Sequence, residues 1–157
     1  MPAHVTHVVV TGAGGFVGGY VARWLADRGN AVTALARRQP VAAQRGLVWR
    51  EADLRAADSL PNRFDVLIHC AAETPARCPD PELLYHANMQ VCRSVFGQAV
   101  AAGAGTIVFM SSMSMYGRIA VPVVTEETIP VAAKPKETQA TSWVRTTGES
   151  RSSTPRS

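Results

Sequence analysis

The chain has 157 residues, of which 46% are hydrophobic and 18% charged, and its formal net charge is +4. This length predicts one domain with a sizeable core, and the small positive excess predicts no nucleic-acid partner. No run is long enough to span a membrane and no signal-peptide pattern opens the chain, so we expect no membrane partner. The three cysteines, Cys70, Cys78 and Cys92, lack metal-ligand spacing. They predict no metal site and reduced thiols in a cytoplasmic protein.

A glycine-rich stretch near the start organises the rest of the chain. Residues 5–11 are apolar and β-branched without polar alternation, which predicts a strand buried on both faces of a parallel sheet. Glycines follow at positions 12, 15 and 18. Gly12 permits a tight turn, Gly15 lets a diphosphate approach the backbone, and Gly18 lets a helix lie close to the sheet.

A helix is expected over residues 15–28, ended by Gly29 and Asn30. Its large apolar residues follow the amphipathic pattern of a helix with one face on the core: Phe16, Val17, Tyr20, Val21, Trp24 and Leu25. Amide groups of its first turn would face the phosphates of a dinucleotide. A plain surface turn is the alternative, but the strand before and the helix after the glycines favour a dinucleotide site. The residues of this segment predicted to bind the cofactor are Gly12, Gly14, Gly15, Phe16, Val17 and Gly18.

The segment from Thr11 to Gly18, Thr-Gly-Ala-Gly-Gly-Phe-Val-Gly, resembles the short-chain dehydrogenase/reductase superfamily. More narrowly, it resembles the extended branch, the NAD(P)-dependent sugar epimerases and dehydratases. The spacing Gly-x-x-Gly-x-x-Gly is one residue longer than the dehydrogenase pattern. The resemblance covers about residues 5–130. It implies an α/β fold, a Rossmann-like doubly wound parallel sheet of order 3-2-1-4-5, incomplete at its C-terminal side.

The second predicted strand, residues 31–36, bears on the choice of cofactor. It ends at Ala36, where an NAD-preferring enzyme usually has an acid that binds the adenosine ribose. Arg37 and Arg38 follow, and arginine can pair with the 2′-phosphate of NADP. The alternative is that both arginines are simply solvated. We therefore expect NADP as the cofactor, with NAD as the second candidate.

A short third strand is predicted over residues 47–50, and Asp53 and Leu54 lie just beyond it. They match a family pair in which the carboxylate accepts from the adenine amino group and the leucine backbone lies near the ring. A helix N-cap is the alternative role for Asp53, because Asp at such a turn satisfies free amide groups.

The fourth strand and its exit turn are expected over residues 65–72. His69, Ala71 and Ala72 match the family pattern His-x-Ala-Ala. The small alanines suit a backbone that passes close to a cofactor. His69 invites an acid–base role, but its place in a strand and the resemblance favour a packed structural histidine.

A long helix is predicted to begin at Asp80-Pro81-Glu82 and to end at Gly103. Asp80 can cap the helix, proline suits its first position, and an acid is favourable in its first turn. Apolar residues expected near one face are Leu84, Val91, Val95 and Ala99. Asn88 lies inside this helix, where asparagine is unfavourable unless its side chain bonds something. In the family an Asn at this place bonds backbone near the active-site end of the sheet. An exposed polar residue is the alternative.

The fifth strand, residues 106–110, leads into a second strong match. Residues 111–117 resemble the Ser-Ser-x-x-x-Tyr-Gly signature of the extended branch. The resemblance implies that Ser112 is catalytic and bonds the reacting substrate oxygen, and that Ser111 lines the cofactor site. Tyr116 is the structural tyrosine of this turn.

The family's catalytic Tyr-x-x-x-Lys has no match here, since no tyrosine follows Tyr116 and none precedes Lys134 or Lys136 by four residues. We predict a Rossmann domain over residues 1–133 and a disordered Ser/Thr/Arg-rich tail over 134–157. A phosphorylatable or nucleic-acid-binding tail is less well supported, and a frameshift or early stop is a further hypothesis. The uncovered fifth strand predicts homodimerisation through its edge, or aggregation.

By resemblance, the function is that of an NAD(P)-dependent epimerase, dehydratase or reductase. Its substrate would be a hydroxyl or ketone compound of the nucleotide-sugar type. Without the tyrosine and lysine, activity is expected to be low or absent. The alternative is a non-catalytic dinucleotide-binding module or a truncated product.

Overall fold

The computed structural model describes residues 5–38, 46–116 and 122–128. The chain divides into two compact units, Met1–Met110 and Ser111–Ser157. The first unit holds the strands and both α-helices found in the described residues. In the second unit a short 3-10 helix spans Met113–Tyr116, and a turn at residues 125–128 is closed by a bond from Thr128 N to Thr125 O. The predicted domain boundary at 133/134 lies outside the described residues.

Five parallel strands form the sheet of the first unit, in the order β3-β2-β1-β4-β5. Their bounds are β1 His7–Thr11, β2 Ala31–Ala36, β3 Leu47–Glu51, β4 Val66–His69 and β5 Thr106–Phe109. The predicted parallel sheet and strand order are confirmed. The chain changes direction across the sheet between β1 and β4, and ligands of such folds bind at the carboxyl edge beside this point.

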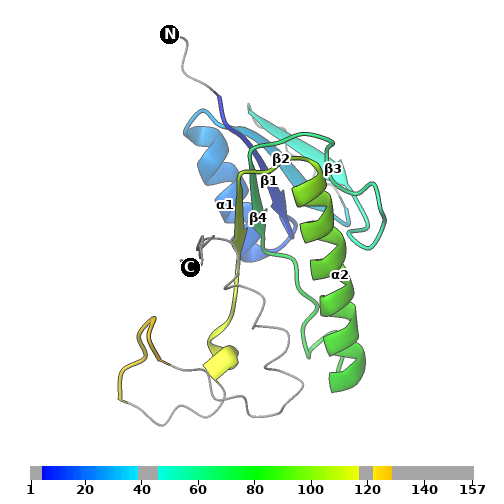
Figure 1. Cartoon of the computed structure of the whole chain (residues 1–157), viewed down its shortest axis with the longest axis vertical. Coiled ribbons are helices and arrows are strands. Elements are labelled where there is room, and N and C mark those ends of the chain that lie inside the picture. Colours follow the sequence, from blue (N-terminus) through cyan, green and yellow to red (C-terminus); the bar gives the residue numbers. More distant parts are fainter. Residues whose placement is uncertain (1–4, 39–45, 117–121, 129–157) are drawn as a thin grey trace, which may run out of the picture. The chain divides into compact units, whose positions relative to one another are not determined.

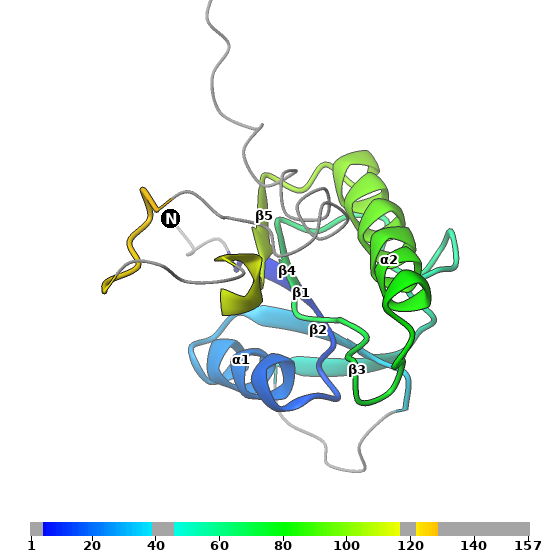
Figure 2. The ribbon, with the colours of Figure 1, turned by 90° about the horizontal axis from the view of Figure 1, so that it is seen from below.

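The two helices, α1 (Phe16–Asp27) and α2 (Pro81–Ala101), lie on opposite faces of the sheet (Figure 1, Figure 2). Both begin and end close to their predicted limits because local signals fix these points. Asp80 caps α2 by accepting hydrogen bonds from Glu82 N and Leu83 N. Gly29 and Gly103 follow the helix ends with φ of +84° and +74°, which glycine adopts without strain.

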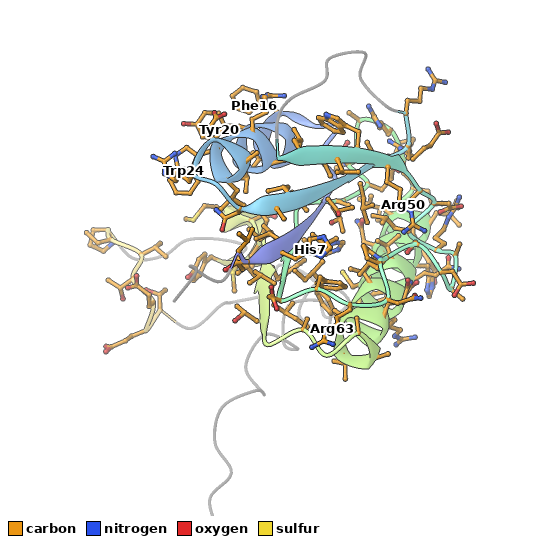
Figure 3. All side chains as sticks on the ribbon, turned by 90° about the horizontal axis from the view of Figure 1, so that it is seen from above. His7, Phe16, Tyr20, Trp24, Arg50 and Arg63 are labelled. Carbon is orange, nitrogen blue, oxygen red and sulfur yellow. The ribbon has the colours of Figure 1, made fainter. Side chains whose placement is uncertain are left out.

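The buried face of α1 differs from the expected one. Its buried residues are small: Gly18, Gly19, Ala22 and Ala26. Phe16, Tyr20 and Trp24 are instead 92%, 62% and 42% exposed. Figure 3 shows these three side chains along the outer side of α1, away from the strands. Glycine and alanine occupy the face of α1 that lies on the sheet because they let the helix backbone approach the strands. Bulky side chains would prevent this approach.

Each sheet face has its own core. The α1 face buries Ala22 and Ala26 against strand residues of β1, β2 and β3: Val8, Val10, Val32, Ala34 and Leu47. The α2 face buries Val95 and Ala99 against Val9, Leu35, Leu67, Leu60 and Phe64. Val91 and Leu84 are only half-buried, so the predicted apolar face of α2 is correct chiefly in its C-terminal half.

Candidate functional site

The turn after β1 is held by contacts that leave no room for side chains. Gly12 has φ of +67°, and a Cβ on it would lie 2.6 Å from Ala71 N, which is too close for real atoms. A Cβ on Gly18 would overlap Gly12 O. The predicted tight turn at Gly12 is therefore confirmed. Gly18 packs its helix against this turn, so that the first turn of α1 rests directly on the carboxyl end of β1.

The first turn of α1 is open for an anion. Gly15 is the N-cap residue and provides no side-chain cap. Its own N–H donates to Gly12 O at 2.9 Å, so it stabilises the turn. The next amides, those of Phe16 and Val17, belong to the first helical turn, whose N–H groups have no partners within the helix. Together with the helix dipole they form the kind of terminus that binds phosphate.

The glycine turn is also tied to the end of β2. Ala13 N donates to Leu35 O at 3.0 Å. A Cβ on Gly14 would lie 3.3 Å from the Ala36 side chain. The structure therefore brings Gly12, Gly14 and Ala71 into one cradle at the carboxyl edge of β1, β2 and β4, with Ala36 at its side. Ala72 follows as an exposed residue.

A buried polar cluster fixes the exit of β4. His69 is fully buried, and one ring nitrogen, Nδ1, lies 2.6 Å from Thr11 Oγ1. Its ring stacks on Phe109 at a centroid distance of 5.8 Å and meets Phe96 edge-on at 5.4 Å. Burial lowers the pKa of His69 to about 4, so the ring is neutral at pH 7. The prediction of a packed structural histidine is confirmed.

Thr11 extends this cluster to the cradle. Its hydroxyl also lies 3.4 Å from Ala71 N, the amide that touches Gly12. Thr11 and His69 thus hold the β4 exit turn against β1. We expected no separate role for Thr11, and its only signal in the sequence is its place directly before the glycine turn.

Asn88 holds the loop after β4. Its Oδ1 accepts a hydrogen bond from Glu73 N at 2.7 Å, and its Nδ2 donates to Glu73 O at 3.1 Å. The family expectation that this asparagine bonds backbone at the active-site end of the sheet is confirmed, and the exposed-residue alternative is wrong. Since both backbone groups of Glu73 are satisfied by one side chain, the loop has a defined position beside the cradle.

The end of β2 carries a charged pair. Arg37 Nη1 lies 3.5 Å from Glu73 Oε2, with the Arg37 side chain 68% exposed and that of Glu73 28% exposed. Arg38 is exposed. Glu73, for which no role was expected, therefore brings a carboxylate to Arg37 at a strand end that has no acid in its own sequence. Its only local signal was its place immediately after the Ala71-Ala72 pair.

Asp53 is occupied by a neighbour. Its two carboxylate oxygens accept from Arg55 Nε at 3.0 Å and Arg55 Nη2 at 2.9 Å, and Oδ1 also accepts from Arg55 N at 3.1 Å. These hydrogen bonds hold the pKa of Asp53 below its usual value. No helix begins at Asp53, so the N-cap alternative is wrong, although the carboxylate does satisfy a free amide. Leu54 is half-buried against the α2-face core.

Ser111 and Ser112 open the second unit of the chain. The hydroxyl of Ser112 lies 2.9 Å from that of Ser114 and accepts from Ser114 N at 3.2 Å. Ser111 Oγ donates to Met115 Sδ at 3.4 Å. Both serines are exposed, and each hydroxyl has a partner within the same short segment. Tyr116 closes the short 3-10 helix that follows.

Within the described part of the chain, no cluster of three or more metal-ligating side chains occurs. The same residues contain no helix that is long and apolar enough to cross a membrane. Cys70, Cys78 and Cys92 are free thiols. Burial raises the pKa of Cys70 and Cys92, which favours their protonated, unreactive form.

Several known proteins share this fold. The UDP-Glc/GlcNAc 4-epimerase of Campylobacter jejuni matches with a TM-score of 0.73 at 20% identity, over 86% of this chain and 45% of that one. A short-chain dehydrogenase/reductase superfamily protein from Agrobacterium tumefaciens, solved with bound NAD, matches with a TM-score of 0.70 at 24% identity, over 83% of this chain and 40% of that one.

Two curated proteins are similar to this chain in sequence. The fatty acid hydroxylase uhd1 of Mycosarcoma maydis is 30% identical, over 77% of this chain and 44% of that protein. UDP-glucuronate 4-epimerase 1 of Arabidopsis thaliana is 31% identical, over 70% of this chain and 30% of that protein. The chain therefore spans less than half the length of these curated relatives.

The family match is broader than the expected region of resemblance. The NAD dependent epimerase/dehydratase family matches residues 8–142, beyond about residue 130, where we expected the resemblance to stop. That expectation is therefore wrong by several residues. With the parallel sheet, the glycine turn and this match in agreement, the chain belongs to the NAD-dependent epimerase/dehydratase family.

Proposed function

We propose that this chain binds a nicotinamide dinucleotide in the cradle of Gly12, Gly14 and Ala71, next to Gly15 and Gly18 of the same glycine turn. The observation that carries the proposal is the closeness of Gly12 to Ala71 and of Gly14 to Ala36, together with a first turn of α1 that no side chain caps. Such a surface lets a diphosphate approach backbone amides directly. The amides assigned to it are those of Phe16 and Val17.

The adenosine end would lie toward the end of β2. There Arg37 and Arg38 offer guanidinium groups to the 2′-phosphate of NADP, and no acid ends the strand. We therefore propose NADP as the preferred cofactor, with NAD as the second. Asp53 and Leu54 would border the adenine, and Asp53 would give up part of its contact with Arg55 to accept from the adenine amino group.

The proposed substrate is a nucleotide sugar or a similar hydroxyl or ketone compound. Support comes from the family and from the relatives named as nucleotide-sugar epimerases. The bound nicotinamide would supply hydride exchange. By resemblance to the family, Ser112, an exposed residue, would orient the reacting substrate oxygen, and Ser111 would take part in cofactor binding.

A second candidate function is dinucleotide binding without catalysis. It is favoured by the absence of Tyr-x-x-x-Lys from this sequence, because positioned acid–base groups contribute a factor of about 100 to 10,000 to the rate. Turnover of a nucleotide sugar by the purified chain would exclude this candidate. Binding without turnover, unchanged in a Ser112→Ala variant, would support it.

The experiment that tests cofactor binding is calorimetric titration of the purified chain with NADPH and with NADH, while circular dichroism reports folding. Saturable binding that is tighter for NADPH is expected. A Gly14→Val variant, whose side chain would meet Ala36, serves as the blocked control. A folded chain that binds neither nucleotide would contradict the proposal.

We also propose self-association through β5. This strand ends the sheet and pairs with β4, and its Ile107 and Val108 are 38% and 43% exposed. Edge strands with apolar side chains pair readily with other strands. Sedimentation of the wild-type chain and of a Val108→Lys variant tests the proposal. A monomeric wild-type chain would contradict it.

A further inference from the structure

Two arginine–carboxylate pairs gather at the carboxyl edge of the sheet, beside the glycine cradle. Arg37 pairs with Glu73 at 3.5 Å, and Arg55 pairs with Asp53 at 2.9 Å. The four residues come from three segments: the end of β2, the turn after β3 and the loop after β4. The two pairs also act on each other, since Arg37 helps to lower the pKa of Asp53 and Glu73 helps to raise that of Arg55. They form one charge cluster in which both arginines already have protein anions.

Glu73 is the best fixed member of this cluster. Asn88 bonds both its backbone N–H and its backbone carbonyl, at 2.7 and 3.1 Å. Its side chain is 28% exposed, whereas those of Arg37, Arg55 and Asp53 are 57% to 68% exposed. The carboxylate of Glu73 pairs with Arg37 from a distant part of the sequence. Arg37 directly follows Ala36, where the local sequence lacks the acid that usually selects NAD.

We propose that Glu73 is a specificity-determining residue that weakens the preference for a 2′-phosphorylated cofactor. This inference rests on the proposed dinucleotide site. To bind Arg37, a 2′-phosphate has to displace the Glu73 carboxylate, and it then lies close to that second anion. A cofactor with a free 2′-hydroxyl binds without displacing the Glu73 carboxylate and without repulsion from it. Arg37 and Glu73 together therefore give a narrow preference between NADP and NAD, although the arginines alone favour NADP.

The test is the ratio of two affinities in a Glu73→Gln variant, which keeps the size of the side chain and removes its charge. Dissociation constants are measured for NADPH and NADH, and for ADP-ribose with and without a 2′-phosphate. Exposed ion pairs contribute up to about 1 kcal/mol, which corresponds to a factor of about five. We expect the preference for the 2′-phosphorylated ligand to rise about fivefold. A general loss of structure would weaken the binding of both kinds of ligand equally and leave the ratio of their affinities unchanged.

Two controls locate the effect. Asp58→Asn removes an equal charge from an exposed residue between β3 and β4 and is expected to leave the ratio within about twofold, because surface charges are screened by solvent. In an Arg37→Met background, Glu73→Gln is expected to raise the ratio by a smaller factor than in the wild-type chain, since no guanidinium is released.

Three outcomes would overturn the inference. The first is an unchanged ratio in Glu73→Gln while both ligands still bind, which leaves the dinucleotide site intact and removes only the role of Glu73. The second is an equal rise in Asp58→Asn or in the Arg37→Met background. The third is a folded wild-type chain that binds none of the four ligands, which removes the proposed function and this inference together.

Discussion

The two helices cover opposite faces of one sheet in different ways. On the α1 face, glycine and alanine bring backbone close to backbone, and the large side chains point outward. On the α2 face, a layer of larger side chains separates helix and sheet, with Phe96 and the buried His69 among them. Because its backbone approaches the sheet closely, α1 shapes the cradle. In contrast, α2 packs a core and leaves its polar residues free to hold loops.

Polar side chains of α2 bind loop backbone at two places. Asn88 holds Glu73 near the carboxyl edge. One turn from the other end, Gln98 accepts from Leu60 N at 3.0 Å and donates to Ala56 O at 3.0 Å. Loops next to a sheet need such partners because their backbone groups lack strand neighbours. Beside α1, the glycine turn is held by its own backbone hydrogen bonds and needs no side chain of the helix.

The sharpest test of this comparison exchanges glycine for alanine in each helix. Gly18→Ala places a Cβ against Gly12 O, so we expect it to lower the free energy of unfolding by about 3 kcal/mol and to weaken dinucleotide binding strongly. Gly97→Ala in α2 meets nothing within 4 Å and is expected to stabilise by about 1 kcal/mol. Chemical denaturation measures both. Equal effects of the two substitutions would show that close backbone contact at Gly18 does not hold α1 against the glycine turn.

The α2 face should make stability depend on pH. The pKa of His69 falls from 6.5 to about 4 in the folded chain, so the unfolded chain binds more protons between these values. Neutral His69 therefore contributes about 3 kcal/mol to the free energy of unfolding above pH 6.5, and this contribution is lost as the pH falls toward 4. Denaturation curves between pH 4 and 7 measure it, with His69→Asn as the comparison. If the stability of His69→Asn changed with pH as that of the wild-type chain does, the pH dependence would not come from His69.

Asn88→Ala tests the loop contacts of α2. It leaves Glu73 N without its partner in a half-buried place, and we expect a loss of about 2 kcal/mol in stability. Because Glu73 would then be less well fixed, the ratio of NADPH to NADH affinity should shift in the direction of the Glu73→Gln variant. Gln90→Ala, an exposed residue of the same helix, is the control. A variant that loses stability with no shift in the ratio would restrict Asn88 to a structural role.

The smallest effect is expected on the outer side of α1. The Phe16 side chain is 92% exposed, so Phe16→Ser should change stability by less than about 0.5 kcal/mol. Its backbone N–H remains, and dinucleotide affinity should stay within about twofold. Denaturation and calorimetry measure the two quantities. A tenfold loss of affinity would assign the aromatic ring itself to the site.

Local signals in the sequence determined most of the fold. Asp80 caps α2, Gly29 and Gly103 follow the helix ends, and the β-branched runs form strands at the expected places. These features depend on backbone preferences that act over a few residues, so they are visible without a structure. The glycine spacing, the short strands and the family resemblance together also predicted the parallel order of the sheet.

Contacts between distant segments follow from tertiary packing and not from local signals. This packing placed small residues of α1 inward, because a close backbone approach outweighs the burial of Phe16, Tyr20 and Trp24. Tertiary packing also joined Arg37 to Glu73, which are far apart in sequence and become neighbours because the chain crosses from β3 to β4 and places β4 beside β1. Periodicity cannot specify such pairs, since it records which residues share a face and not what lies opposite that face.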